Sequence, residues 1–379
     1  MKGFSKSGSL LAIAAASGLL LTACGTTGGD SDSSASGGSC NVTLAYLGPT
    51  TGDYANLGLN IAGGAQVAID EYKDKGGKCT VSLKKFDSQG DPTKATPLAK
   101  TIIDDESVVG VVGPAFSGES DATGAAFNEA GLVTVSASAT NPDLTKNGWT
   151  TFHRVLGTDS DQGPGAAKYI TDTVKAKKVF VIDDASEYGK GLADSVADTL
   201  GSAVTARDTV QQKQTDFSAT VTKVKASGAD AVFYGGYYAE ASLLKKQLTQ
   251  AGWNGTYVTG DGSLDPQFVK AAGAKAAEGT VFTCPCAPSP ADFTKKYEKV
   301  NGGKEPGTYS AEGYDATNVL LAGIDAGDAT REKLLDFVNS YDADGLTKHI
   351  KFTDGDVSEV VIYTYVVKNG QIVPQGEVK

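Results

Sequence analysis

The stretch Val42–Phe86 reads VTLAYLGPTTGDYANLGLNIAGGAQVAIDEYKDKGGKCTVSLKKF. It opens and closes on apolar runs rich in β-branched residues, Val42–Leu47 and Val81–Phe86, which predict two β-strands. Between them, Ile61–Tyr72 places apolar residues at positions i, i+4, i+7 and i+11, which predicts one apolar helix face. A strand, a helix and a second strand in this order predict a right-handed βαβ unit with parallel strands.

The same alternation of short strands and amphipathic helices continues along the chain. The further runs that predict strands are Val108–Val112, Leu132–Val135, Lys178–Ile182, Ala203–Thr209, Ala231–Tyr234, Thr256–Thr259 and Thr280–Phe282. They fall into two sets separated near residue 158, and together they are too widely split for one compact sheet. We therefore expect an α/β protein with two doubly wound parallel-sheet lobes. The C-terminal part is mostly helical, ends in the strand-like Val360–Val367, and must return to one or both lobes.

The N-terminus has the pattern of an export signal. Residues 1–23 combine Lys2 and Lys6 with an apolar stretch too short to span a bilayer, which predicts a signal peptide. The tetrapeptide Leu21-Thr22-Ala23-Cys24 resembles a bacterial lipobox, which implies that Cys24 is acylated and becomes the first mature residue. A plain signal peptide or a short membrane anchor are the alternatives. Residues 24–40 are rich in Gly, Ser, Thr and Asp and are expected to form a flexible tether.

Four further cysteines are interpreted in this exported context. Cys40 directly precedes the first predicted strand and Cys79 the second, so neighbouring strands would bring the two sulfurs together as a disulfide. Cys284 and Cys286 flank a single proline and could close a small ring. A metal site would need four clustered ligands, which the sequence does not offer, so we expect neither a metal nor a cofactor.

Composition and missing motifs exclude several classes of protein. The formal net charge is −11 and no basic run occurs, so nucleic acid is not an expected partner. Neither the phosphate-binding pattern G-x-x-x-x-G-K-[ST] nor a dinucleotide-binding G-x-G-x-x-G after the first strand is present. The adjacent acidic pairs Asp104-Asp105 and Asp183-Asp184 are expected to be solvated.

Polar or aromatic residues follow five of the predicted strands. Ligands of open α/β sheets bind beyond the carboxyl ends of the strands, where these loops lie. Each residue alone is more often a helix cap, but together they describe a cleft with hydroxyl groups on one wall, tyrosines on the other and one carboxylate, which suits a small zwitterion. The candidate ligand-binding residues are Ser117, Ser138, Thr140, Tyr188, Tyr237 and Asp261.

Five longer stretches carry a family resemblance: Ser136–Thr145, Phe152–Ile170, Tyr188–Ala193, Asp216–Ala219 and Phe233–Glu240. Through them, residues 41–379 resemble the branched-chain amino acid (leucine/isoleucine/valine-type) binding proteins of ABC importers, which have the type I periplasmic-binding fold. In that fold the chain crosses between the lobes three times and the crossings form a hinge. The resemblance implies one lobe at 41–158 and 285–357, and a second at 159–284 and 358–379.

The resemblance also implies a role for each candidate. Ser117 and Thr140 occupy the positions whose hydroxyls bind the ligand carboxylate in the family, and Ser138 occupies the position whose backbone lines the same wall. Tyr188 and Tyr237 match the aromatic residues that close over the ligand. Asp261, at a position where the leucine-binding members carry Glu, takes the ligand ammonium.

Three other positions bear on this comparison. Asp159, at the first crossing, matches a position that we interpret as structural. Leu57 replaces a tyrosine that contacts the ligand side chain in the family, and Tyr54 could compensate for it. The preference for a leucine-type side chain is therefore open at this point.

The expected function is capture of a small amino acid, of the leucine, isoleucine and valine class, by a monomeric extracytoplasmic lipoprotein. The protein would be lipid-anchored to the outer face of the cell membrane and would deliver the ligand to the permease subunits of an ABC importer, without catalysis. One alternative is the same fold binding amides, urea-like compounds or aromatic acids. A remote alternative is an exported serine hydrolase that uses Ser117 or Ser138 with His153 as its base.

Overall fold

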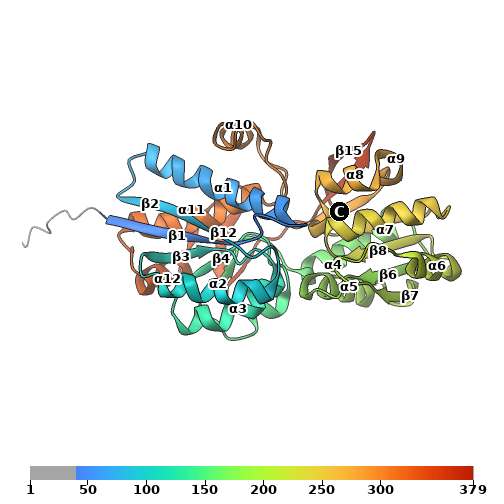
Figure 1. The fold of residues 1–379 in the computed structure, drawn as a ribbon, viewed down its shortest axis with the longest axis horizontal. Helices are drawn as coiled ribbons and strands as arrows, with labels where there is room; N and C mark the ends of the chain where they lie inside the picture. The colour runs from blue at the N-terminus through green and yellow to red at the C-terminus, as the bar shows by residue number, and fades with distance from the viewer. Residues whose placement is uncertain (1–39, 379) are drawn as a thin grey trace, which may run out of the picture. The chain divides into compact units, whose positions relative to one another are not determined.

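The computed structural model describes residues 40–378, so the predicted signal peptide, Cys24 and nearly all of the tether lie outside the described residues. Residues 40–154 build a five-stranded parallel sheet in the order β2-β1-β3-β4-β5 (Figure 1). Its strands are β1 (Cys40–Gly48), β2 (Cys79–Asp87), β3 (Val108–Val112), β4 (Thr134–Ser136) and β5 (Phe152–Arg154). The connecting helices are α1 (Ala55–Asp74), α2 (Pro92–Asp104) and α3 (Ser117–Glu129).

A second sheet has seven strands in the order β15-β14-β10-β9-β8-β6-β7. The strands are β6 (Val179–Asp183), β7 (Val204–Thr209), β8 (Ala231–Gly235), β9 (Thr256–Thr259), β10 (Val281–Cys284), β14 (Tyr363–Lys368) and β15 (Gln371–Glu377). Its helices are α4 (Asp159–Lys168), α5 (Glu187–Leu200), α6 (Ser218–Ser227), α7 (Tyr238–Gln250), α8 (Pro266–Ala272) and α9 (Ala274–Ala277). Strands β6 to β10 are parallel, whereas β14 and β15 are antiparallel additions at one edge. The expected α/β fold with two parallel sheets is confirmed, and the C-terminal hairpin adds to it.

The segment between β10 and β14 returns to the first sheet. It consists of α10 (Ala291–Val300), α11 (Ser310–Ala326), α12 (Arg331–Asn339), β11 (Asp342–Asp344), β12 (His349–Thr353) and β13 (Asp356–Val357). The Arg154 backbone N–H donates to the Gly355 carbonyl, and Arg331 donates to three backbone carbonyls between residues 103 and 108. The chain thus passes between the two sheets after β5, after β10 and after β13, while the lobe boundaries given above stay a prediction.

Helices α1 and α11 pack face to face at glycines. A Cβ on Gly64 would lie 1.9 Å from the Ser310 carbonyl oxygen, and one on Gly313 would lie 2.5 Å from the Ile61 carbonyl oxygen. Only glycine permits this approach, since real Cβ atoms do not come so close to backbone. The contact holds the first turn of α11 against α1. Tyr309 is the residue immediately before α11.

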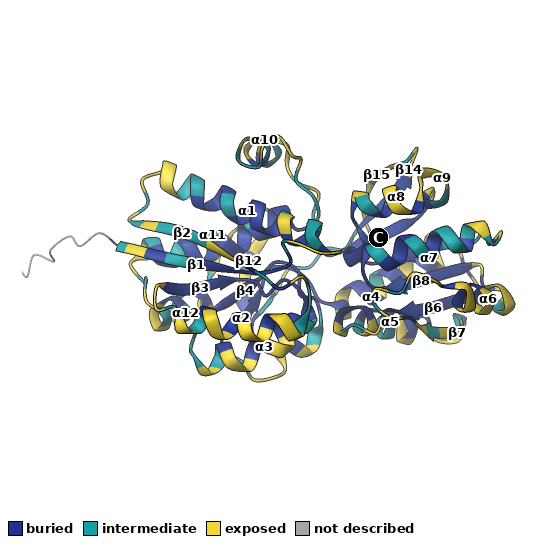
Figure 2. Ribbon diagram, in the orientation of Figure 1, coloured by how far each residue is buried: buried dark blue, intermediate teal, exposed yellow. Residues whose placement is uncertain are grey.

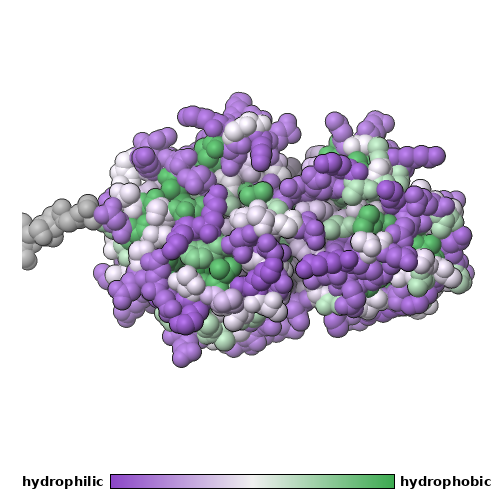
Figure 3. All heavy atoms as spheres, viewed as in Figure 1, coloured by the Kyte–Doolittle hydropathy of each residue, from purple (hydrophilic) through white to green (hydrophobic). Residues whose placement is uncertain are grey.

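The core lies along the interior strands: β3, β4, β6, β8 and β10 are buried throughout, whereas the edge strands β2, β7 and β15 are partly exposed (Figure 2). The face drawn in Figure 3 is covered mostly by hydrophilic residues, with apolar residues in scattered patches. Among the described residues, Leu59 is the one large apolar side chain classed as exposed. Within 40–378, no helix combines the length and the apolar character needed to cross a membrane.

Both cysteine pairs form disulfides. Cys40 and Cys79 are register partners at the start of β1 and β2, with Cα atoms 4.6 Å apart, which confirms the predicted pairing. Cys284 and Cys286 are also joined, at the end of β10 where the chain leaves the second sheet.

The expectation that Asp183 and Asp184 are solvated is wrong. Both are buried, because Asp183 ends the interior strand β6, Asp184 directly follows it, and both supply acceptors to the loop after the strand. Asp183 accepts from the Ala185 N–H at 3.0 Å, and Asp184 accepts from the Ser186 N–H at 3.0 Å. Burial raises the pKa of Asp184 to about 7. By contrast, Asp104 is exposed and pairs with Lys100, as expected.

We predict that the double substitution Cys40→Ala and Cys79→Ala lowers the free energy of unfolding by roughly 3 to 4 kcal/mol, the chain-entropy value for a loop of about 40 residues. Urea denaturation of the variant and the wild type measures the difference. The control is the same comparison in a reducing agent that opens the disulfides of both proteins. A difference that persists undiminished after reduction would show that the loss comes from packing rather than from the cross-link.

Candidate functional site

The loops at the carboxyl ends of both sheets meet at one small cavity. The gaps among its lining residues total about 190 Å³ and are too narrow to admit a water molecule. The lining consists of Phe116, Ser117, Ser138, Tyr188, Tyr237, Asp261, Gly262 and Tyr309. Five of the six predicted ligand-binding residues are therefore brought together, drawn from both sheets, and Thr140 lies outside this lining.

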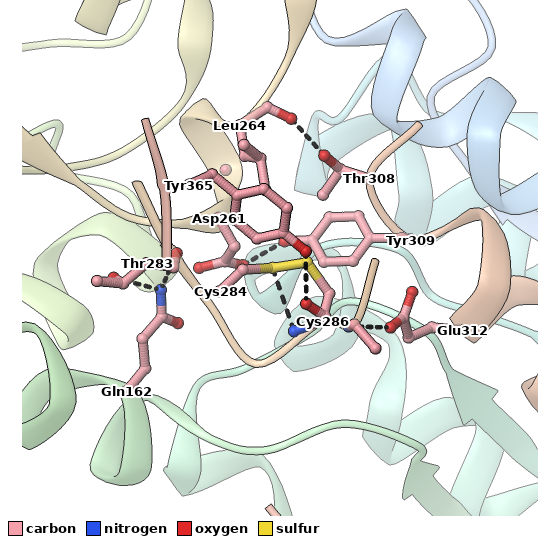
Figure 4. Close-up of a disulfide and its surroundings, with 12 residues drawn as sticks. Gln162, Asp261, Leu264, Thr283, Cys284, Cys286, Thr308, Tyr309, Glu312 and Tyr365 are labelled. Carbon is pink, nitrogen blue, oxygen red and sulfur yellow. Dashed lines mark hydrogen bonds between the residues drawn. A yellow bond between two sulfur atoms is a disulfide. The ribbon is translucent and has the colours of Figure 1, made fainter. Parts of the chain in front are cut away.

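Asp261 is the charged group of this cavity. It follows β9 in a short 3₁₀-helix and is completely buried. Tyr188, in the first turn of α5, donates its hydroxyl to Asp261 Oδ1 at 2.9 Å. The Tyr309 hydroxyl donates to Asp261 Oδ2, as Figure 4 shows. Burial raises the pKa of the Asp261 carboxyl, and the hydrogen bonds from Tyr309 and Tyr188 oppose that rise.

The hydroxyl wall is built on the first sheet. Ser117 is the first residue of α3, and its Oγ accepts from the Asn141 N–H at 3.2 Å. The Ser138 hydroxyl donates to the Ala115 carbonyl, so the two loops are tied together. Backbone N–H groups at the start of a helix have no intrahelical partner, and the helix dipole favours an anion there. The wall can therefore bind a carboxylate.

A buried arginine supports this wall from behind. Arg154 in β5 donates from Nη1 to the carbonyls of Ala139 at 2.9 Å and of Asn141 at 2.7 Å, on either side of Thr140. Its Nε pairs with Asp356 at 2.6 Å. The guanidinium thus determines the path of the loop that carries Ser138 and Thr140.

Asp159 lies close enough to Asp261 to feel its charge, and Thr140 lies beside Asp159. Thr140 and Asp159 are both fully buried. Within residues 40–378, Thr140 Oγ1 and both carboxylate oxygens of Asp159 have no hydrogen-bond partner of good geometry. Thr140 nevertheless lies near enough to lower the pKa of Asp159, while burial and the charge of Asp261 raise that pKa well above its usual range. A buried carboxylate left without donors is costly, which marks this corner as a place for a cationic group.

Aromatic rings form the remaining wall. Tyr237 packs against Phe116, Tyr54 and Tyr188, with ring centroids 4.7, 4.8 and 5.2 Å apart. Leu57, at the position where the family carries a tyrosine, is fully buried in the core instead. The Tyr54 ring therefore supports the aromatic wall at this side of the cavity.

Sequence reasoning missed Tyr309, Phe116 and the unpartnered state of Asp159. Tyr309 lies in the C-terminal part of the chain, and no strand precedes it to signal a site. It adopts a left-handed backbone with φ of 68° directly before α11. Phe116 directly precedes Ser117 in the loop after β3. The rule that ligands bind in the loops after strands could therefore have predicted Phe116 as well.

His153 is not placed to activate a serine. It is buried in β5, where its ring nitrogens contact the Thr151 carbonyl at 3.3 Å and Asn339 Oδ1 at 2.9 Å. Burial lowers the pKa of its imidazole. Neither Ser117 nor Ser138 is among its partners, so the geometry of a serine and histidine pair is not formed.

A larger cavity, with about 1050 Å³ between its lining atoms on the measure that gives 190 Å³ for the first, lies beside the Cys284–Cys286 disulfide. Its lining includes Leu264, Pro288, Thr308 and Tyr365, and one charged side chain, Glu305. None of the predicted ligand-binding residues reaches it. Its one carboxylate, Glu305, is exposed to water, whereas Asp261 in the smaller cavity is fully buried, so the smaller cavity is the candidate site for a charged ligand group.

Comparison with known proteins agrees with this fold. The sequence profile of a family described as "Periplasmic binding protein" matches residues 41–371. The chain belongs to this family.

Relatives of this periplasmic binding protein include the Leu/Ile/Val-binding protein BraC3 of Rhizobium johnstonii, 35% identical over 75% of this chain and 79% of the relative. A leucine-, isoleucine-, valine-, threonine- and alanine-binding protein of Pseudomonas aeruginosa is 29% identical over 86% of this chain and 89% of the relative. Among solved structures, the branched-chain amino acid transporter substrate-binding protein of Streptococcus pneumoniae in complex with isoleucine aligns with a TM-score of 0.83. It is 28% identical, and the alignment covers 89% of this chain and 99% of that one.

We predict that Asp159→Asn makes the binding protein, freed of ligand by unfolding and refolding, more stable at pH 7.5 but not at pH 4. The folded-state pKa of Asp159 is raised above its unfolded value, so the folded state holds a proton that the unfolded state releases. The wild type therefore loses stability as the pH rises from about 4 through the raised pKa, and the neutral amide removes that loss.

Urea denaturation at the two pH values measures the effect. Asp121→Asn is the matched control, because Asp121 is exposed on α3. Equal gains from both substitutions, or a gain from Asp159→Asn that is the same at both pH values, would contradict the prediction.

Proposed function

We propose that this periplasmic binding protein captures a small amino acid of the leucine, isoleucine and valine class between its two lobes and delivers it to an ABC importer. The observation that carries the proposal is Asp261, a buried carboxylate that faces the hydroxyl wall of Ser117 and Ser138 across one cavity. An acid opposite hydroxyls and helix N–H groups complements the ammonium and carboxylate of one zwitterion. The names of the relatives support the same ligand class.

Each charged end of the ligand has its own set of partners. The ligand carboxylate accepts hydrogen bonds from Ser117, from the N–H groups that begin α3, and from the Ser138 and Thr140 loop. The ammonium donates to Asp261 and to the unpartnered oxygens of Asp159. Such charge-assisted bonds are stronger than neutral ones, and the dry surroundings strengthen them further.

The ligand side chain faces the aromatic wall of Phe116 and Tyr237. An aliphatic side chain loses its contact with water there and needs no hydrogen-bond partner. Asp261 is one methylene shorter than the Glu of leucine-binding members, and the Tyr309 hydroxyl holds it in place. The part of the cavity that receives the ligand side chain is therefore bounded by the aromatic rings of Phe116 and Tyr237 rather than by charged groups.

We propose lobe boundaries at 41–158 with 285–357, and at 159–284 with 358–379. The lobes turn about the three crossings and close on the ligand, because the ligand contacts both lobes at once. Binding by these contacts requires no covalent step, and we propose that the protein has no catalytic activity.

For the location we propose a monomeric, extracytoplasmic lipoprotein, anchored through Cys24 to the outer face of the cell membrane and tethered by residues 24–40. The sequence before residue 40 supports this proposal. Mass spectrometry of the protein purified from its own host membranes would test it. A mature N-terminus at Cys24 with acyl mass supports the anchor, and an unmodified cysteine contradicts it.

Isothermal titration calorimetry with the twenty amino acids tests the binding proposal. The full chain is unfolded and refolded beforehand to remove bound ligand. Heat with leucine, isoleucine or valine supports the proposal. Heat with only polar or aromatic amino acids keeps the zwitterion site but contradicts the ligand class, and silence across the panel contradicts the amino-acid function.

We expect Asp261→Asn and Thr140→Ala each to weaken amino-acid binding at least tenfold. Each removes a hydrogen bond to a charged ligand group, worth roughly 1.5 to 3 kcal/mol. Ser242→Ala is the matched control, because it removes a buried hydroxyl that bonds only within α7. Unchanged affinity in both site variants would mean that the ligand binds elsewhere.

A further inference from the structure

Tyr54 and Glu240 form a buried hydrogen bond outside the candidate cavity. It joins the part of the molecule built on the first sheet, called here the first half, to the part built on the second sheet, the second half. The Tyr54 hydroxyl donates to Glu240 Oε1 at 3.0 Å, and both side chains are nearly inaccessible. Tyr54 immediately precedes α1, which belongs to the first sheet, and Glu240 lies in the first turn of α7, which belongs to the second. Neither residue lines the cavity.

Each partner is held firmly from its own side. The Lys213 N–H donates to Glu240 Oε1 at 2.6 Å, so the carboxylate is oriented within the second half. The Tyr54 ring meets the Phe116 ring of the first half, with centroids 6.2 Å apart. Across the boundary it also packs against Tyr237. The acceptor and the donor are thus pre-oriented to meet when the halves approach.

A second bond lies beside the first. Asn56 Nδ2 donates to Asp265 Oδ1 at 3.2 Å, again from the start of α1 to the second half. Asp265 also caps α8 by accepting from the Gln267 N–H at 2.7 Å. Both bonds therefore link the N-terminal end of α1 to the second half, one to the first turn of α7 and the other to the residue that caps α8.

We propose that Tyr54 and Glu240 are positioning residues that form an interlobe latch, holding the lobes closed over the ligand and setting the rate at which the ligand leaves. The inference rests on the proposed function only in requiring a ligand between the lobes. The latch bond exists only when the lobes are together, so it stabilises the closed form without touching the ligand. Its loss should speed dissociation and leave association with the open form unchanged.

Stopped-flow kinetics with L-leucine tests the latch in the full chain. Tyr54→Phe removes the hydroxyl and keeps the ring, and we expect the dissociation rate to rise roughly tenfold, the effect of one hydrogen bond to a charged group. Association should stay within about twofold. Glu240→Gln keeps an acceptor for Tyr54 and Lys213 and should dissociate at nearly the wild-type rate, whereas Glu240→Ala should match Tyr54→Phe.

Tyr257→Phe is the matched control. It removes a buried tyrosine hydroxyl that bonds to the Ala241 carbonyl within the second half, at 3.3 Å. Faster dissociation in Tyr54→Phe but not in Tyr257→Phe supports the latch, and so does a double variant Tyr54→Phe with Glu240→Ala that is no faster than either single variant. An unchanged dissociation rate in Tyr54→Phe, or the same rise in Tyr257→Phe, overturns it.

A ligand-free measurement separates the latch from the proposed ligand class. If L-leucine does not bind the wild type, the proposed ligand class fails, and the latch is then judged by small-angle X-ray scattering without amino acid. Loss of the closed component in Tyr54→Phe, with its retention in Tyr257→Phe, supports the latch. Identical scattering from Tyr54→Phe and the wild type overturns it.

Discussion

The buried carboxylate of Asp261 is the constraint on which the arrangement of the site depends. Removing a carboxylate from water is expensive unless donors replace the lost hydration. Tyr188 and Tyr309 supply these donors from segments that lie 73 residues before and 48 residues after Asp261. Because the two tyrosines come from different halves of the molecule, satisfying this single acid requires the halves to approach each other. The same approach brings the hydroxyl wall of Ser117 and Ser138 opposite the acid.

Two internal supports keep the partners of Asp261 in place. Gly64 and Gly313 let α1 and α11 touch at backbone distance, which sets the position of Tyr309 at the start of α11. On the opposite wall, Arg154 binds the carbonyls on either side of Thr140. Neither support lines the cavity, yet each determines the position of a residue near it. The positions of Tyr309 and Thr140 therefore depend on packing contacts outside the cavity.

Sequence reasoning predicted residues that line the cavity wherever local rules apply. Ser117, Ser138, Tyr188, Tyr237 and Asp261 all follow strands, and the carboxyl ends of parallel strands necessarily share one edge. Tyr309 could not be found in this way, since its place depends on the return of the chain to the first sheet and on the packing of α11. The expectation that Asp183 and Asp184 are solvated was wrong for a related reason: adjacency in the sequence does not reveal that both acids lie at the end of an interior, buried strand. The unpartnered oxygens of Asp159 likewise appear only when neighbours from distant segments are in place.

The order of strands in the second sheet has a consequence for how a growing chain can fold. Strand β14 pairs with both β10 and β15, so the edge of β10 stays open until residues 363–377 have been made. Tyr309, one of the two donors to Asp261, is likewise among the last quarter of residues to be joined to the chain. Contacts between segments so distant in sequence form slowly, and a partly made chain exposes strand edges meanwhile. A nascent chain that ends before β14 has all the predicted binding residues, but strand β10 still lacks its antiparallel neighbour, so the second sheet is complete only once the last residues of the polypeptide have been added.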